Sequence, residues 1–132
     1  MTTHVLPHKL VEALVERLSA VVPAQFQLNT RGARLHVDLR GAMSSIFSFD
    51  IVEDESRELN KRLETAVWSV LSSLQDDISE DLCTPWPSTD GRMMAMPEVH
   101  SDGEQVHLWY GDERAPVLSL PAIRIEEITG GD

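Results

Sequence analysis

The fold is decided by the stretch at residues 54–82, which reads DESRELNKRLETAVWSVLSSLQDDISEDL. Its apolar side chains recur at intervals of three or four residues, which places them on one side of an α-helix. They are Leu59, Leu63, Val67, Val70, Leu74, Ile78 and Leu82, with Ala66 and Leu71 widening the stripe. The opposite side is polar and includes Glu64 and Gln75. The stretch therefore predicts a long amphipathic helix lying on a hydrophobic core, with its N-cap at Asp54 or Ser56.

A second, shorter helix is predicted near the N-terminus. It starts at Pro7, a residue favoured in the first turn, and stops before Pro23. Its apolar side carries Leu10, Val11, Leu14, Leu18 and Val21. From residue 25 the hydrophobic period changes to two, which is typical of strands. Residues 26–28 and 35–39 form a predicted hairpin around a turn, and residues 46–52 form a third predicted strand.

The segment after the long helix returns to extended structure. Pro85 and Pro87 prevent the helix from continuing, so the chain is expected to cross over to further strands. These strands are predicted at residues 93–100, 105–110 and 117–125, the last one broken or edged by Pro121. The chain thus predicts a single α+β domain over residues 1–132. We expect an antiparallel sheet of about five strands with both helices packed on one face, in the order α-β-β-β-α-β-β(-β).

The composition is that of an ordinary folded protein. Of the 132 residues, 42% are hydrophobic and 25% are charged, which suits one domain with its own core. The longest apolar runs are too short to span a bilayer, and the first residues lack the basic and apolar regions of a secretory signal. The one cysteine, Cys83, cannot form an internal disulfide. We therefore expect a cytoplasmic protein that does not associate with membranes.

The formal net charge is −11, and the acidic residues are concentrated after residue 40. Residues 1–40 contain five Lys or Arg and three Asp or Glu, whereas residues 41–132 contain six and nineteen. Phosphate backbones bind Lys and Arg, so direct nucleic-acid binding is disfavoured, as is attraction to an anionic membrane. The predicted partner is a protein with a basic surface. The alternative is that the net charge serves solubility alone.

The end of the long helix carries four acidic residues, Asp76, Asp77, Glu80 and Asp81. The helix dipole disfavours anions at a C-terminus by about 0.3–1 kcal/mol each, and like charges at i, i+4 repel one another. A locally unfavourable cluster can mark a functional site. These residues are therefore predicted to bind a basic partner or, weakly, a divalent cation. The alternative is a solvated helix end screened by salt.

Four large aromatic residues are the second candidate for a partner-binding surface: Trp68, Trp86, Trp109 and Tyr110. Trp68 and Trp109 fall outside the main apolar phase of their elements, and half-exposed tryptophan is favoured in binding surfaces. Trp86, between two prolines, is either a stiff anchor for a partner or a plug at the end of the core. A short run of methionines is either an adaptable interface or a core edge; it consists of Met93, Met94 and Met96.

No motif for a cofactor, a nucleotide or a catalytic nucleophile is found in the sequence. The five histidines have no Glu or Cys partner at the spacing of a zinc motif, so no metal site is predicted from them. One arrangement nevertheless supports a small enzyme or ligand-binding domain. His36 and Asp38 share a face of a predicted strand, and His107 lies on the polar side of another strand. A pocket where these three side chains meet is the alternative prediction.

The sequence therefore predicts a small acidic protein-binding module without catalytic residues or cofactors, adaptor-like or chaperone-like and forming a homodimer. In size, acidity and order of elements the chain is similar to class I chaperones of bacterial secretion systems, although it lacks the closing helix of that fold. The resemblance implies a dimer that holds a segment of another protein.

Overall fold

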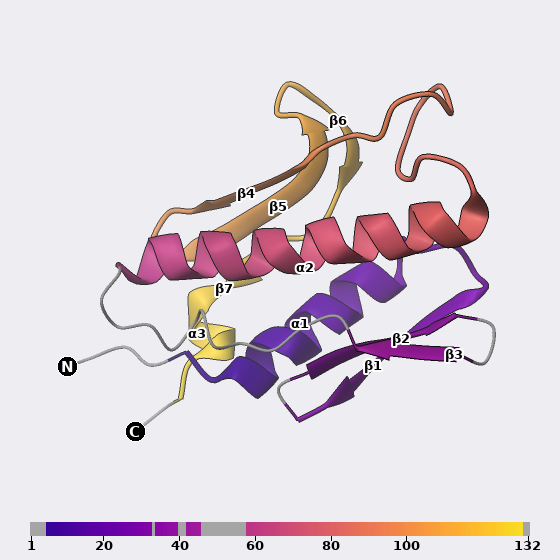
Figure 1. Cartoon of the computed structure of the whole chain (residues 1–132). Helices are drawn as coiled ribbons and strands as arrows, with labels where there is room; N and C mark the ends of the chain where they lie inside the picture. The colour runs from indigo at the N-terminus through magenta and orange to yellow at the C-terminus, as the bar shows by residue number, and fades with distance from the viewer. Residues whose placement is uncertain (1–4, 33, 40–41, 46–57, 131–132) are drawn as a thin grey trace.

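The computed structural model describes residues 5–32, 34–39, 42–45 and 58–130 (Figure 1). Within these ranges the chain forms three helices and seven strands. Their order is α1 (Pro7–Ser19), β1 (Phe26–Arg31), β2 (Arg34–Leu39), β3 (Ala42–Ser45), α2 (Leu59–Leu82), β4 (Pro97–Ser101), β5 (Gln105–Asp112), β6 (Ala115–Ser119), β7 (Ile123–Arg124) and α3 (Ile125–Ile128). The strand pairs are antiparallel, so the predicted α+β class with antiparallel sheet structure is confirmed.

The described strands form two sheets instead of the predicted single sheet. β1, β2 and β3 make one sheet, and β4, β5 and β6 make a second sheet in which β7 also pairs with β5. The two helices do not share one face either, because α1 packs on β1 and β2 whereas α2 packs on β4 and β5. In Figure 1 β4–β6 lie above α2, and α1 with β1–β3 lies below it. The physical reason is that side chains of α2 occupy the outer edge of β4, where a further strand would pair.

The N-terminal part follows its hydrophobic pattern. α1 has Pro7 in its first turn and buries Leu10, Val11, Ala13, Leu14 and Leu18. The predicted hairpin forms from β1 and β2, and Gly32 at its turn has φ +61°, which a glycine adopts without a Cβ clash. β3 pairs with β2 and comes earlier than the predicted third strand. That predicted strand, residues 46–52, lies outside the described residues.

α2 buries the apolar stripe that the sequence predicts. The fully buried members are Leu63, Ala66, Val67, Val70, Leu71, Leu74 and Ile78, and Leu59 and Leu82 are partly buried. The helix begins at Leu59, later than predicted, because the backbone of Glu58 is extended with φ −58° and ψ 146°. The predicted N-caps Asp54 and Ser56 lie outside the described residues. Long as α2 is, no described helix has the length and apolar character needed to cross a membrane.

The C-terminal segment links α1 to the second sheet through hydrogen bonds and an ion pair. The predicted last strand is split around Pro121 into β6 and β7, and Ile125 begins α3 instead of continuing the strand. The Arg17 guanidinium donates hydrogen bonds of 2.9 Å to the carbonyls of Pro121 and Ala122. The same group pairs with the Glu127 carboxylate at 2.7 Å. One cluster of buried side chains therefore extends through both sheets and all three helices.

Candidate functional site

The outer edge of β4 is covered by side chains from α2. The indole N–H of Trp68 donates a 3.2 Å hydrogen bond to the carbonyl of Pro97. The backbone N–H of Ser101 donates to the Glu64 carboxylate at 3.0 Å, and the Ser101 hydroxyl donates to the Asn60 amide oxygen at 2.7 Å. The register with β5 turns the backbone groups of residues 97, 99 and 101 outward, so α2 takes the place of a neighbouring strand.

The same row of contacts continues along the second half of α2. The Gln75 amide donates a hydrogen bond to the carbonyl of Ala95, and the Ser79 hydroxyl contacts the Met94 sulfur at 3.2 Å. Ser79 also accepts the Trp86 backbone N–H at 2.9 Å. Gln75 was predicted on the solvated side of the helix, which is wrong: it is buried because the chain before β4 runs over it. We call this line of contact between α2 and residues 94–101 the seam.

The exposed large apolar side chains lie on α2 and on the segment that the seam joins to it, with Met93 one residue before that segment. Trp68 is 42% exposed, Met93 76%, Met94 37% and Met96 59%, and these are the exposed large hydrophobic residues among the side chains that the structure places. Each belongs to a segment held by the seam contacts, Trp68 through Pro97 and the methionines through Ala95 and Ser79. We call these four side chains the seam patch. Their exposure favours an interface over a core edge.

The acidic end of α2 adjoins the helix residues that hold the methionine segment. Asp76 and Glu80 are exposed and follow the seam residues Gln75 and Ser79 in the helix. Asp77 and Asp81 are half-buried. The last turn of α2 contains no basic residue, so its negative dipole end adds to the carboxylates. Among the described residues no group of three His, Cys, Asp or Glu side chains is placed to hold a metal ion.

Two of the predicted aromatic residues lie beneath the surface. Tyr110 is fully buried on β5, and its hydroxyl donates a 2.8 Å hydrogen bond to the Leu71 carbonyl of α2. Burial also raises the pKa of Tyr110 above its ordinary value, because the phenolate would lose its hydration. Trp86 is half-buried and packs edge-to-face on Tyr110, with ring centroids 5.6 Å apart. A fully buried ring offers no surface to a partner, so Tyr110 supports the sheet from within.

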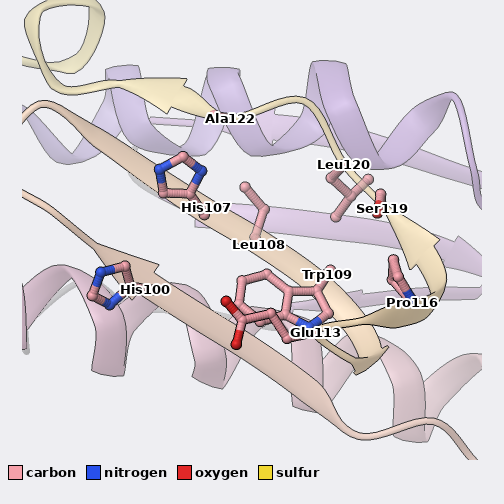
Figure 2. Close-up of a pocket in the computed structure, with 9 residues that line it drawn as sticks. All are labelled: His100, His107, Leu108, Trp109, Glu113, Pro116, Ser119, Leu120 and Ala122. Atoms are coloured by element: carbon pink, nitrogen blue, oxygen red, sulfur yellow. The ribbon is translucent and has the colours of Figure 1, made fainter.

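The other two ring-bearing candidates of β5, His107 and Trp109, line a pocket on the opposite face of the strand (Figure 2). The pocket has a volume of about 410 Å³, and its polar lining comes mainly from His100, His107 and Glu113. His100 lies directly opposite His107 in the register of β4 and β5, and their rings stack with centroids 6.4 Å apart. The cross-strand partner of His107 is not readable from sequence, which is why His100 was missed.

The structure does not gather the three residues of the predicted enzymatic pocket. His36 and Asp38 lie on β2 in the first sheet, whereas His107 lies on β5 in the second sheet. Neither residue of β2 lines the pocket at His107. The chain matches no family model, no curated protein and no solved structure.

Proposed function

We propose that the protein is a non-catalytic binding module that holds a basic, amphipathic segment of a protein partner on the seam patch. The observation that carries the proposal is the exposure of Trp68 and three methionines on α2 and on the segment that Gln75 and Ser79 hold against its acidic end. A segment with apolar residues on one side and lysine or arginine on the other matches both properties of this surface.

The apolar part of the surface suits an interface. The Trp68 ring is held in place by its hydrogen bond to the Pro97 carbonyl, so ordering it on binding costs little conformational entropy. Methionine side chains are flexible and polarizable, and they adapt to different partner side chains. Together they offer a fixed anchor beside an adaptable surface, in the manner of chaperones and adaptors that hold varied segments.

The charge of the surface selects the partner. The exposed residues Asp76 and Glu80 are next in the helix to Gln75 and Ser79, which hold the methionine segment, and the net charge of the whole chain is −11. Such a field attracts a basic segment and raises its rate of association. It disfavours a second copy of the same chain at this patch, because two acidic helix ends would meet. Homodimerisation through another surface stays a prediction, and we expect the protein to act in the cytoplasm.

The test uses a short amphipathic peptide of leucine and lysine, with a leucine–glutamate peptide as its charge control. Isothermal calorimetry should detect binding of the lysine peptide only, weakening as salt is raised. Trp68→Ala, the double variant Met93→Gln/Met96→Gln, and Asp76→Asn/Glu80→Gln should each weaken binding about tenfold or more. The matched control is Glu12→Gln/Glu16→Gln, which removes two exposed carboxylates from α1.

Equal affinity of all variants for the lysine peptide would overturn the proposal, as would equal binding of the two peptides. Light scattering on the wild type and on Trp68→Ala tests whether a second copy of this chain binds the patch instead. If the wild type is a dimer and Trp68→Ala is a monomer, the patch serves a second copy and the basic partner is excluded. Circular dichroism verifies that each variant keeps its helix content.

A further inference from the structure

The pocket on the outer face of the second sheet has walls from three strands. His107, Leu108 and Trp109 of β5 form its floor, with His100 of the neighbouring β4 beside them (Figure 2). The turn before β6 supplies Glu113, and the carboxylate lies next to the Trp109 indole in this view. A volume of about 410 Å³ falls in the range of small-molecule sites. None of the seam patch residues lines it.

Each of the two histidines that line the pocket has one acceptor nitrogen when it is neutral. His107 Nε2 is 3.1 Å from the Asp102 carboxylate, and His100 Nδ1 is 3.5 Å from the Glu64 carboxylate. The contact of His107 with Asp102 is a hydrogen bond, and a carboxylate only accepts, so a neutral His107 carries its proton on Nε2. Its Nδ1 then keeps a lone pair, and a neutral His100 likewise keeps one acceptor nitrogen. Each neutral imidazole can therefore accept one hydrogen bond.

Trp109 and Glu113 add an aromatic face and a negative charge. The indole N–H of Trp109 donates to the Gly111 carbonyl at 3.1 Å, so the ring is fixed and its N–H is already used. What remains for a ligand is the ring itself, which attracts cations. Glu113 is the one acidic residue of the pocket lining, and the lining contains no Lys or Arg. An anion in this pocket would face hydrogen-bond acceptors and the Glu113 carboxylate, with no positively charged side chain of the lining to balance it. The lining therefore disfavours anions.

We propose that this pocket binds a guanidinium group. A guanidinium is planar and stacks on an indole, and its five N–H donors match a carboxylate and two imidazole acceptors. A compact ammonium has three donors and no flat face, so it fits the same lining less well. The group comes either from a free small molecule or from an arginine side chain of a peptide, and both sources offer the pocket the same chemistry.

The test titrates the full-length protein with methylguanidinium and with acetyl-Gly-Arg-Gly-amide while the Trp109 indole N–H resonance is followed by NMR. Methylammonium and acetyl-Gly-Lys-Gly-amide are the controls with equal charge. Trp109→Leu identifies the resonance, and in that variant the backbone amide resonance of His107 should show no saturable shift. Glu113→Gln should weaken binding about tenfold, the loss expected for one charge-assisted contact. Glu104→Gln, an exposed carboxylate on the turn before β5, should leave it unchanged.

Saturable binding of methylguanidinium supports the site and a free ligand as its source, whereas binding of the arginine peptide alone supports the site and a protein source. Either result requires the loss with Glu113→Gln. Equal binding of the ammonium controls, or an affinity that Glu113→Gln leaves unchanged, would overturn the proposal. So would the absence of any saturable shift from both arginine-type probes. The seam patch variants should bind these probes like the wild type, which separates this site from the proposed partner surface.

Discussion

The hydroxyl of Tyr110 donates a 2.8 Å hydrogen bond to the backbone carbonyl of Leu71, and this bond joins the buried face of β5 to the middle of α2. Both residues are fully buried. Tyr110→Phe removes the bond and keeps the ring that packs on Trp86, so we expect a loss of about 1 kcal/mol in the free energy of unfolding. Urea denaturation followed by far-UV circular dichroism measures it. Trp109→Phe, on the outer face of the same strand, should cost less; an equal or larger loss there would contradict the assignment of Tyr110 as the link.

Gln75 holds the methionine segment against α2 through the Ala95 carbonyl. Gln75→Leu keeps the size of the side chain and leaves that carbonyl without its donor, so we expect a destabilisation of about 1–3 kcal/mol. The lysine peptide should also bind less tightly, since the seam patch loses its support. Asp76→Leu changes the next residue, which is exposed, and should leave stability within about 0.5 kcal/mol of the wild type. Stability of Gln75→Leu equal to that of the wild type would show that the bond is not needed.

Gly111 lies at the irregularity between β5 and β6, where its φ is +106°. A Cβ at this position would come within 2.9 Å of the Val117 backbone nitrogen, so Gly111→Ala combines backbone strain with a backbone clash. Gly103 has φ +96° and open space around it, which makes Gly103→Ala the matched control for strain alone. We expect Gly111→Ala to lower the thermal midpoint further than Gly103→Ala does. Equal midpoints would mean that β6 moves aside without cost.

Asp102 accepts hydrogen bonds from the backbone N–H groups of Gln105 and Glu104, and these, with His107, lower the pKa of its carboxyl from 3.8 to about 2. A carboxyl with a lower pKa in the folded state stabilises the fold when it is ionised. Its contribution is therefore complete above about pH 4 and is lost as the pH falls toward 2. Asp102→Asn keeps the acceptor oxygen and does not titrate.

We expect the stability difference between the wild type and Asp102→Asn to shrink as the pH falls through this range. Urea denaturation at several pH values, together with a carboxyl carbon NMR titration, measures the effect. A carboxyl that titrates near its unfolded value would contradict it.

The parts of the fold that depend on local pattern could be predicted from the sequence. The stripe from Leu63 to Ile78, the first-turn proline of α1 and the β1–β2 hairpin all follow from spacing along the chain. The division into two sheets could not be predicted, because it depends on which distant segment meets the edge of β4. The predicted start of α2 was wrong for a local reason. The backbone at Glu58 is extended, which the helix propensities of the residues do not reveal.

The candidate sites show the same division. The phase of Trp68 and Trp109 along their elements indicated that neither would be part of the core, and the structure leaves Trp68 exposed and Trp109 half-buried. Tyr110 follows the apolar phase of β5 and is buried accordingly. Gln75 was predicted on the solvated side of the helix, since only the fold reveals that another segment crosses it. His100 gains its place beside His107 through strand register, which the sequence does not specify.

Because α2 covers the outer edge of β4, it also affects the tendency of the protein to aggregate when it is concentrated or partly unfolded. A bare strand margin is a template on which strands of other molecules add one after another, which is how fibrils begin. In this protein Trp68 and Glu64 already form hydrogen bonds with the backbone of Pro97 and Ser101. A strand of a neighbouring molecule therefore cannot pair with these backbone groups. Mild denaturant that loosens α2 is therefore expected to start aggregation at β4 while the hairpin with β5 is still intact.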